Sequence, residues 1–230
     1  MTVINEQPTE DLASLKEKFV TACRVLVNEG VSEAAFNVSV RLSGNRMMTP
    51  MRETSPTLVT ADNLQITEIG TGAVNWGVHP AIYRERSDVN AIVHVHPPYA
   101  VAFGTLGKEF RPIHHYGAPF HGKIAVDDCP GQSESSERRA AELARLLGAN
   151  RLLLQRGHGT ISVGKDLKEA LLLTLYFEEA CKIFSTARQM GGEPEYLTLE
   201  QSEKIAGQIL KQRTQEKTWA HYVDKLGWRK

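Results

Sequence analysis

The chain has 230 residues, 41% of them hydrophobic, and its 27 basic side chains balance its 27 acidic ones. This length suits one domain with a sizeable core. A net charge of zero argues against nucleic acid or an anionic membrane surface as a partner, because both select for a basic excess. The sequence also has no apolar run near the roughly 20 residues that a membrane span needs, and no signal-peptide pattern at its start.

Three widely spaced cysteines bear on the compartment of the protein. They are Cys23, Cys129 and Cys181, and an odd number suits no closed disulfide framework. Cys23 and Cys181 fall in apolar helical patterns and are expected to be core thiols, whereas Cys129 is expected in a loop. We therefore expect a soluble, cytoplasmic protein.

In the first third of the chain, one helix precedes a group of strands. Apolar residues at three- and four-residue steps predict a helix over residues 9–29. Alternation predicts a strand at 37–42, and a turn at 44–45 leads into a second extended segment at 46–50. A further strand is predicted within 56–66, with a turn at its Asp-Asn pair.

The middle of the chain mixes short elements of both kinds. A short helix is predicted over residues 79–86, and the apolar run at 91–95 predicts a buried strand. The double proline at 97–98 is typical of a helix start, where the missing N–H costs nothing. Another helix is predicted over 133–147, with serines before it as caps.

The last third predicts two strands and three helices. Strands at 151–155 and 160–164 flank a turn, and a long helix runs over 166–189. Two shorter helices follow at 197–228. Interspersed helices and short strands favour an α/β layered domain with a mixed, mainly antiparallel sheet over a regular doubly wound parallel sheet. We expect a single domain over residues 1–230, with its core at about 10–190.

Histidines gather in two motifs. In "AIVHVHPP", His94 and His96 lie two residues apart on a strand and therefore project to one face. In "RGHG", His158 lies between two glycines that let the backbone bend and a ligand approach. Together they supply the three nitrogen ligands of an open metal site, with positions left for water or substrate. A pair of half-exposed strand histidines without a ligand is the alternative for His94 and His96.

The ordered segments "NVSVR", "TP", "HPAIYRERSDVNAIVHVHPPYAVAF" and "RGHGTISVGKDLKEAL" resemble the class II aldolase/adducin family. The resemblance runs from about residue 10 to about residue 190. It implies an α/β fold with a mixed, largely antiparallel sheet covered by helices. It also implies one divalent metal ion per subunit, held by residues matching His94, His96 and His158. Three imidazoles do not choose among zinc, manganese, iron and cobalt.

The family resemblance also implies a homotetramer with sites near subunit interfaces. C-terminal residues can then complete a neighbour's pocket, which makes His221 and Tyr222 candidates for substrate contact. A purely structural C-terminal helix is the alternative. Tyr116, in the loop "RPIHHYGAPFHG", is a further candidate for substrate binding.

The sequence departs from the sugar-phosphate aldolases of this family at their acid/base residue. Those enzymes carry a glutamate shortly before the H-x-H motif, and the matching stretch here is "GAVNWG". Asn75 stands for the glutamate, and Ala73 and Val74 stand for two serines. An amide cannot take up a proton as a carboxylate does, but Asn75 can orient a substrate or a water molecule by hydrogen bonding.

The phosphate-binding segments of those aldolases are altered as well. Phe36 stands for the glycine of the phosphate loop, although Asn37 is kept, and Met51 and Arg52 replace small residues. The hydroxyls and the glycine backbone that would hold a phosphate dianion are therefore missing. We expect a substrate without a phosphate group.

A retained metal site without the aldolase base favours decarboxylation, because CO2 leaves as a neutral fragment while the metal stabilises the resulting enolate. We predict a metal-dependent, non-oxidative decarboxylase of a catechol-type aromatic carboxylate or a related oxo or enol acid. Arg52 is the candidate carboxylate clamp, with a plain surface arginine as the alternative. His115, with His79, is the candidate proton donor.

Three other functions stay open. A metal-dependent aldolase or dehydratase could act on a non-phosphorylated substrate with another residue as acid/base. An Fe(II) oxygenase is a more distant alternative, since three nitrogens can hold that ion. The third is a non-enzymatic, adducin-like interaction module. Such a module would have no need to keep all three histidines.

Overall fold

The computed structural model describes residues 11–32, 34–70, 77–129 and 136–228. Its centre is a seven-stranded sheet of order β3-β2-β1-β4-β7-β6-β5. Every neighbouring pair is antiparallel except β5 and β6, which are parallel. The strands are β1 (Asn37–Leu42), β2 (Arg46–Pro50), β3 (Leu64–Glu68), β4 (Ala91–Val95), β5 (Ile124–Asp127), β6 (Leu152–Gln155) and β7 (Gly159–Gly164).

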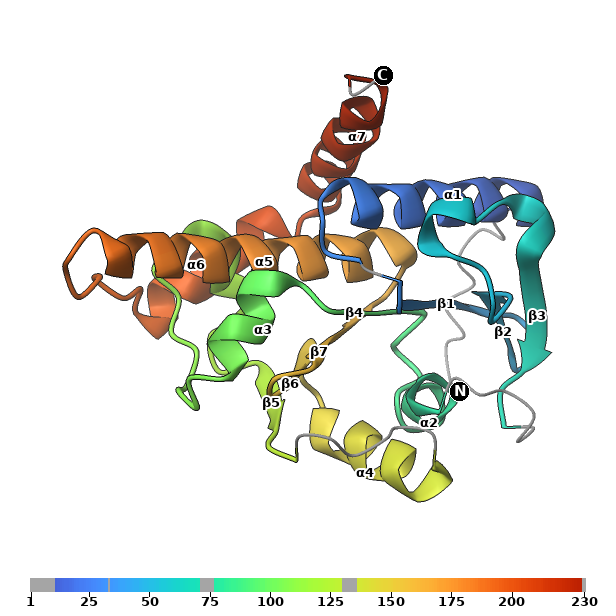
Figure 1. Ribbon diagram of the computed structural model, residues 1–230, viewed down its shortest axis with the longest axis horizontal. Helices are drawn as coiled ribbons and strands as arrows, with labels where there is room; N and C mark the ends of the chain where they lie inside the picture. Colours follow the sequence, from blue (N-terminus) through green and yellow to red (C-terminus); the bar gives the residue numbers. More distant parts are fainter. Residues whose placement is uncertain (1–10, 33, 71–76, 130–135, 229–230) are drawn as a thin grey trace, which may run out of the picture.

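Helices cover both faces of the sheet. In Figure 1, α1 and α5 lie along one face and α2 and α4 lie against the other, while α7 projects away. The α-helices are α1 (Leu12–Asn28), α2 (Val78–Glu85), α3 (Pro98–Gly104), α4 (Glu137–Leu147), α5 (Leu167–Gln189), α6 (Leu199–Ile209) and α7 (Gln212–Trp228). The 3-10 helices among the described residues are η1 (Pro56–Leu58), η2 (Ala61–Asn63) and η3 (His115–Phe120). The expected α/β fold with a mainly antiparallel sheet is confirmed.

The sheet separates two apolar cores. One contains residues of α1, α3 and α5 and takes Val93 and Val95 from β4. The other contains residues of α2 and α4 and takes Ile92 from the same strand. Alternate residues of a strand point to opposite faces, so His94 shares its face with Ile92, toward α2 and α4. This assignment decides which side chains can meet the histidines.

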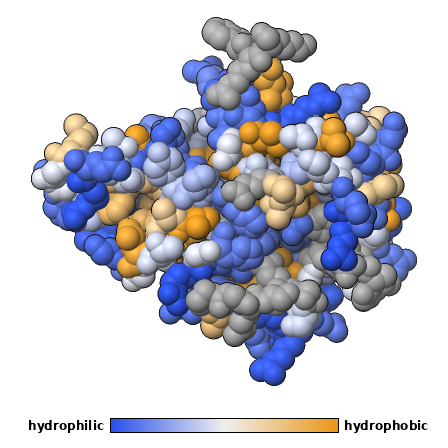
Figure 2. Space-filling view, in the orientation of Figure 1, coloured by the Kyte–Doolittle hydropathy of each residue, from blue (hydrophilic) through white to orange (hydrophobic). Residues whose placement is uncertain are grey.

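Most of the surface in the view of Figure 2 is polar, and apolar residues gather over α3. Tyr99, at its start, and Leu106, just after its end, are among the exposed large apolar side chains. None of the helices described combines the length and the apolar character needed to span a bilayer. Cys23 and Cys181 are buried and Cys129 is exposed, all three as free thiols, as expected.

One local prediction needs correction, and one strand was not predicted. The strand predicted within 56–66 begins only at Leu64, because η1 and η2 occupy the preceding residues. Asn63 closes this segment, accepting from the Thr60 N–H and donating to the Leu58 carbonyl. β5 was not predicted, since four residues give little periodicity. The start of the helix predicted over 133–147 lies outside the described residues, and α4 begins at Glu137 with Ser136 as its N-cap.

Candidate metal centre

His94 lies near the carboxyl end of β4, the central strand of the sheet, and His96 directly follows that strand. His94 is buried, with 4% of its surface exposed. His96 follows the last strand residue and is half-buried. The strand directs His94 toward the α2 and α4 face, and the His96 ring, one position beyond Val95, lies 5.5 Å from the His94 ring between centroids. The two rings therefore lie close together.

His158 reaches the carboxyl end of β4 through the turn between β6 and β7. Its backbone N–H donates to the Gln155 carbonyl at 3.1 Å, which closes a four-residue turn. Gly157, the third residue of that turn, has φ +69°, a conformation that glycine adopts without strain. Thr160, shortly after the turn, pairs with Val95 of β4. The turn therefore delivers His158 to the end of β4.

The three histidines meet at the carboxyl end of β4. Each histidine offers one ring nitrogen as a ligand atom, and these three nitrogens all lie within 4.8 Å of one another. The ring centroids are 5.5 Å apart for His94 and His96, 5.2 Å for His94 and His158, and 4.9 Å for His96 and His158. Imidazole nitrogens on one first-row cation lie about 2.0–2.1 Å from it and so roughly 3–3.5 Å from one another. Small side-chain rotations would bring these nitrogens to that spacing, so the donor set fits a divalent cation.

A glycine makes this arrangement possible. A Cβ atom at Gly159 would lie 2.6 Å from Cδ2 of His96 and 2.6 Å from the Val95 carbonyl oxygen. Real Cβ atoms do not approach other atoms so closely. The second glycine of the "RGHG" motif is therefore needed for the packing of β7 against His96, in addition to the turn.

Two predicted substrate-binding residues lie at the same edge of the sheet. Asn37, the first residue of β1, is the register partner of His94. Side chains of directly opposed residues share a face, with Cβ atoms about 4.5–5.5 Å apart. Arg52 follows the end of β2, the next strand along, and is exposed. Asn75, which the resemblance predicts to stand at the aldolase glutamate position, lies outside the described residues.

His79 is close to this region but deeply placed. Its side chain on α2 has no exposed surface. Its Nδ1 lies 2.7 Å from Oγ of Ser39, and that oxygen lies 2.8 Å from the phenol oxygen of Tyr83. Burial raises the pKa of Tyr83, so its phenol stays protonated. Sequence reasoning did not identify Ser39, because one serine in an alternating strand carries no signal of a buried partner.

The other candidate residues lie on the opposite face of the sheet. Tyr116 stacks on Tyr176 of α5, with ring centroids 4.4 Å apart and an interplanar angle of 9°. His115 is exposed and its ring centroid lies 4.1 Å from that of Tyr116. Tyr116 and Tyr222 pack against the core on the α1 and α5 side, and His221 precedes Tyr222 on α7. Within one chain, these residues and His94 are on different faces of the sheet.

The comparisons with known proteins identify the family. The class II aldolase and adducin N-terminal domain matches residues 17–185. The chain therefore belongs to the class II aldolase and adducin family, as its motifs predict. Enzymes of this family typically depend on a divalent metal, in keeping with the histidine cluster.

Individual relatives differ in their named reactions. A 3,4-dihydroxyphthalate decarboxylase of Arthrobacter keyseri is 25% identical over 201 residues, covering 78% of this chain and 81% of that protein. A 5-methylthioribulose-1-phosphate/5-deoxyribulose-1-phosphate aldolase of Rhodospirillum rubrum is 27% identical over 199 residues, covering 84% and 89%. The structure of L-fuculose 1-phosphate aldolase from Glaciozyma antarctica superposes with a TM-score of 0.80 at 21% identity, covering 96% and 93%. By name both sequence relatives are lyases, and the structural match establishes the fold.

Proposed function

We propose that this protein is a metal-dependent, non-oxidative decarboxylase of a catechol-type aromatic carboxylate or a related oxo or enol acid. The observation that carries the proposal is the meeting of three histidines at one edge of the sheet. The replacement of the aldolase glutamate by Asn75 supports it, as does the named activity of the Arthrobacter keyseri relative.

In this proposal His94, His96 and His158 hold one divalent cation, with zinc, manganese, iron and cobalt as the candidates. When bound, such an ion supplies a Lewis acid that attracts the electron pair left as CO2 departs. The exposed position of His158 leaves an approach for the substrate from solvent. His94, which is buried, would bind the cation from the side facing the protein interior.

Neighbouring side chains would bind the organic acid. Arg52 is proposed to hold a carboxylate, because a guanidinium offers two parallel donors. Asn37, directly across from His94, is proposed to hydrogen-bond a substrate hydroxyl. Asn75 is proposed to orient the substrate without taking up a proton. None of these three residues can replace the base that an aldol cleavage needs.

The reaction ends with protonation of carbon. The bond between the ring or chain carbon and the carboxylate breaks, its electron pair is delocalised onto a neighbouring oxygen of the substrate as an enolate, and a proton then adds to that carbon. We assign the donation to His115, which is exposed, together with His79, which is buried and hydrogen-bonded to Ser39. Tyr116, His221 and Tyr222 are assigned to substrate contact.

These last residues require a second copy of the chain. His115, Tyr116, His221 and Tyr222 lie across the sheet from His94, so in this proposal they serve the site of a neighbouring subunit. A homotetramer with sites at its interfaces would provide that arrangement. The proposal also treats residues 1–230 as one domain and places the protein in the cytoplasm, in keeping with its free thiols.

One alternative has a specific observation in its favour. The Rhodospirillum rubrum relative is named as an aldolase, so an aldolase or dehydratase acting on a non-phosphorylated substrate is the second candidate. It would need an acid/base residue other than Asn75. The two candidates differ in the product released, CO2 for one and an aldehyde or water for the other.

The test is a product assay on the protein loaded in turn with each candidate metal. Dihydroxybenzoates and 3,4-dihydroxyphthalate are supplied with and without oxygen, and CO2 and the decarboxylated product are measured. We expect stoichiometric CO2 release that is independent of oxygen and lost in His94→Ala. Aldehyde release without CO2 would support the aldolase alternative, and turnover only with oxygen would contradict a non-oxidative reaction.

A further inference from the structure

The junction between β4 and α3 lacks the usual means of capping a helix. After His96 the chain runs through Pro97 and Pro98, which have no backbone N–H. Pro97 is the N-cap of α3 and provides no side-chain acceptor. The next two backbone N–H groups, of Tyr99 and Ala100, therefore need an acceptor from elsewhere in the fold.

Glu178 of α5 provides that acceptor. Its Oε1 accepts from the N–H of Tyr99 at 3.0 Å, and its Oε2 accepts from the N–H of Ala100 at 2.8 Å. The partners are 79 and 78 residues apart in the sequence. Hydrogen bonds to an ionised carboxylate are stronger than those between neutral groups, and a negative charge is favourable at a helix start. One side chain thus accepts from both of the first N–H groups of α3.

The carboxyl group of Glu178 is partly buried, so its hydrogen bonds to these two N–H groups matter for its charge. Burial raises the pKa of its carboxyl, while the N–H groups of Tyr99 and Ala100 act in the opposite direction. The carboxylate therefore depends on these two donors for much of its solvation. Its helix, α5, packs in the same core as Val93 and Val95 of β4. Both β4, before His96, and the start of α3, after it, are therefore in contact with α5.

We propose that Glu178 is a positioning residue for the candidate metal ligand His96. The inference rests on the proposed metal site. On one side of His96 the backbone is fixed by the β4 ladder. On the other side it is fixed by the proline pair, by the bond from the Val101 N–H to the Pro97 carbonyl at 2.9 Å, and by Glu178. Loss of the carboxylate frees the turn and lets the His96 ring leave the orientation in which it faces His94 and His158.

The experiment measures metal binding without substrate. Chelator-treated wild type, Glu178→Ala and Glu178→Gln are titrated with Mn²⁺ by calorimetry and by electron paramagnetic resonance. Groups that orient a metal ligand contribute about 10- to 100-fold to metal affinity, and we expect a loss of that size for Glu178→Ala. Glu178→Gln keeps one carbonyl acceptor, so we expect a smaller loss and a variant that folds even if the alanine variant does not.

Two controls separate positioning from general destabilisation. Glu179→Gln, on the same helix and one residue away, should bind Mn²⁺ as wild type does. Amide hydrogen exchange at Tyr99 and Ala100 should accelerate in the Glu178 variants, at temperatures well below unfolding. Unchanged Mn²⁺ affinity in both Glu178 variants would overturn the positioning role while leaving the metal site intact. A wild type that binds no metal ion would instead overturn the proposed site, and the role of Glu178 with it.

Discussion

Gly159 and His96 approach each other so closely that a side chain at position 159 would overlap the His96 ring. The missing Cβ would lie 2.6 Å from Cδ2 of the His96 ring. The backbone of β7 thus begins directly against a ring supplied by β4. This contact fixes where the imidazole of His96 can lie, and so connects a sequence motif to the geometry of the candidate metal centre.

Gly159→Ala should therefore displace the His96 ring. We expect a loss of Mn²⁺ affinity of about tenfold or more, as for other changes that disturb the orientation of a ligand. Overpacking should also lower the free energy of unfolding by about 1–3 kcal/mol. Calorimetric titration and urea denaturation measure the two effects.

Gly207→Ala is the matched control for this substitution. Gly207 lies in α6, and a Cβ atom there meets nothing within 4 Å. Alanine is the better helix former, so this variant should keep or slightly raise stability and bind Mn²⁺ normally. Equal Mn²⁺ affinity in both variants would show that the contact with Gly159 does not hold His96 in place.

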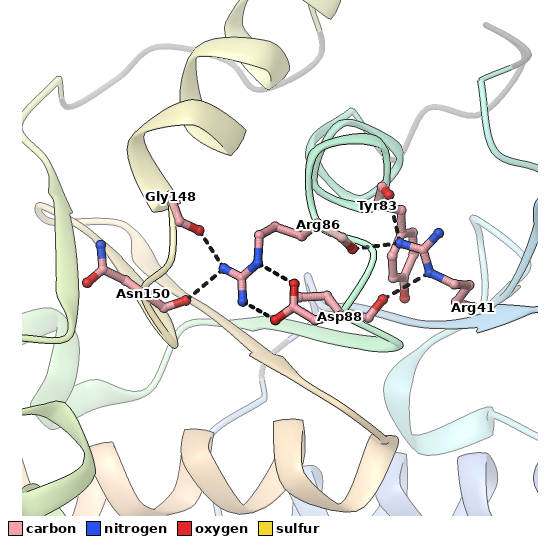
Figure 3. A network of polar contacts seen from close by, with 7 residues as sticks. Arg41, Tyr83, Arg86, Asp88, Gly148 and Asn150 are labelled. Carbon is pink, nitrogen blue, oxygen red and sulfur yellow. Dashed lines mark hydrogen bonds and ion pairs between the residues drawn. The ribbon is translucent and has the colours of Figure 1, made fainter. Parts of the chain in front are cut away.

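Arg86 joins two segments at the other end of the sheet (Figure 3). Its guanidinium pairs with Asp88 at 2.7 Å and donates to the carbonyls of Gly148 and Asn150, at the junction of α4 and β6. Its own carbonyl accepts from Arg41 of β1. This network lies before the start of β4, whereas the histidines lie at its end.

Arg86→Ala should lower the free energy of unfolding by about 2 kcal/mol, because charged hydrogen bonds to two carbonyls are lost. Mn²⁺ affinity should stay at the wild-type value. Arg138→Ala, which removes an exposed ion pair with Glu142, should change stability far less than Arg86→Ala does. A stability loss in Arg86→Ala no greater than in Arg138→Ala would contradict a bridging role.

Asp88 should give the protein a measurable acid sensitivity. Its hydrogen bond to Arg86 holds the pKa of its carboxyl below the usual range. The folded state therefore binds this proton less tightly than the unfolded state, whose pKa is about 3.9. The stabilisation is present above that pKa and is lost as the pH falls through the lower folded pKa.

The measurement compares unfolding free energies of wild type and Asp88→Asn at neutral pH and at pH values below about 4. Because Asp88 is largely exposed, the difference at neutral pH should be no more than about 1 kcal/mol. It should shrink toward zero in acid. A difference of the same size at both pH values would mean that ionisation of Asp88 does not contribute.

The histidine cluster was predictable because short-range rules place its members. Strand alternation puts His94 and His96 on one face, and the glycines around His158 indicate a tight turn. The pairing of β4 with β7 that joins the two motifs is a tertiary contact, and it followed from the family resemblance. The close approach of Gly159 to His96 could not be foreseen from either motif.

Other features depend on contacts that leave no local pattern. Glu178 lies in an apolar helix far along the chain from Tyr99, so nothing in the sequence connects them. The side of the sheet on which Tyr116 packs depends on its stacking with Tyr176. β5 has only four residues, and its pairing with β6 is what defines it as a strand.

Metal stoichiometry tests the central claim most directly. Purified wild type, His94→Ala, His158→Ala and the control His121→Ala are dialysed with each candidate metal and analysed for bound ions per chain. His121 is a suitable control because its Nδ1 lies 2.8 Å from Oγ of Ser202, in a contact between η3 and α6. We predict one ion per chain in wild type and in His121→Ala, and none in the other two at concentrations that saturate wild type. A wild type without bound metal, or a full ion per chain in both His94→Ala and His158→Ala, would contradict the account.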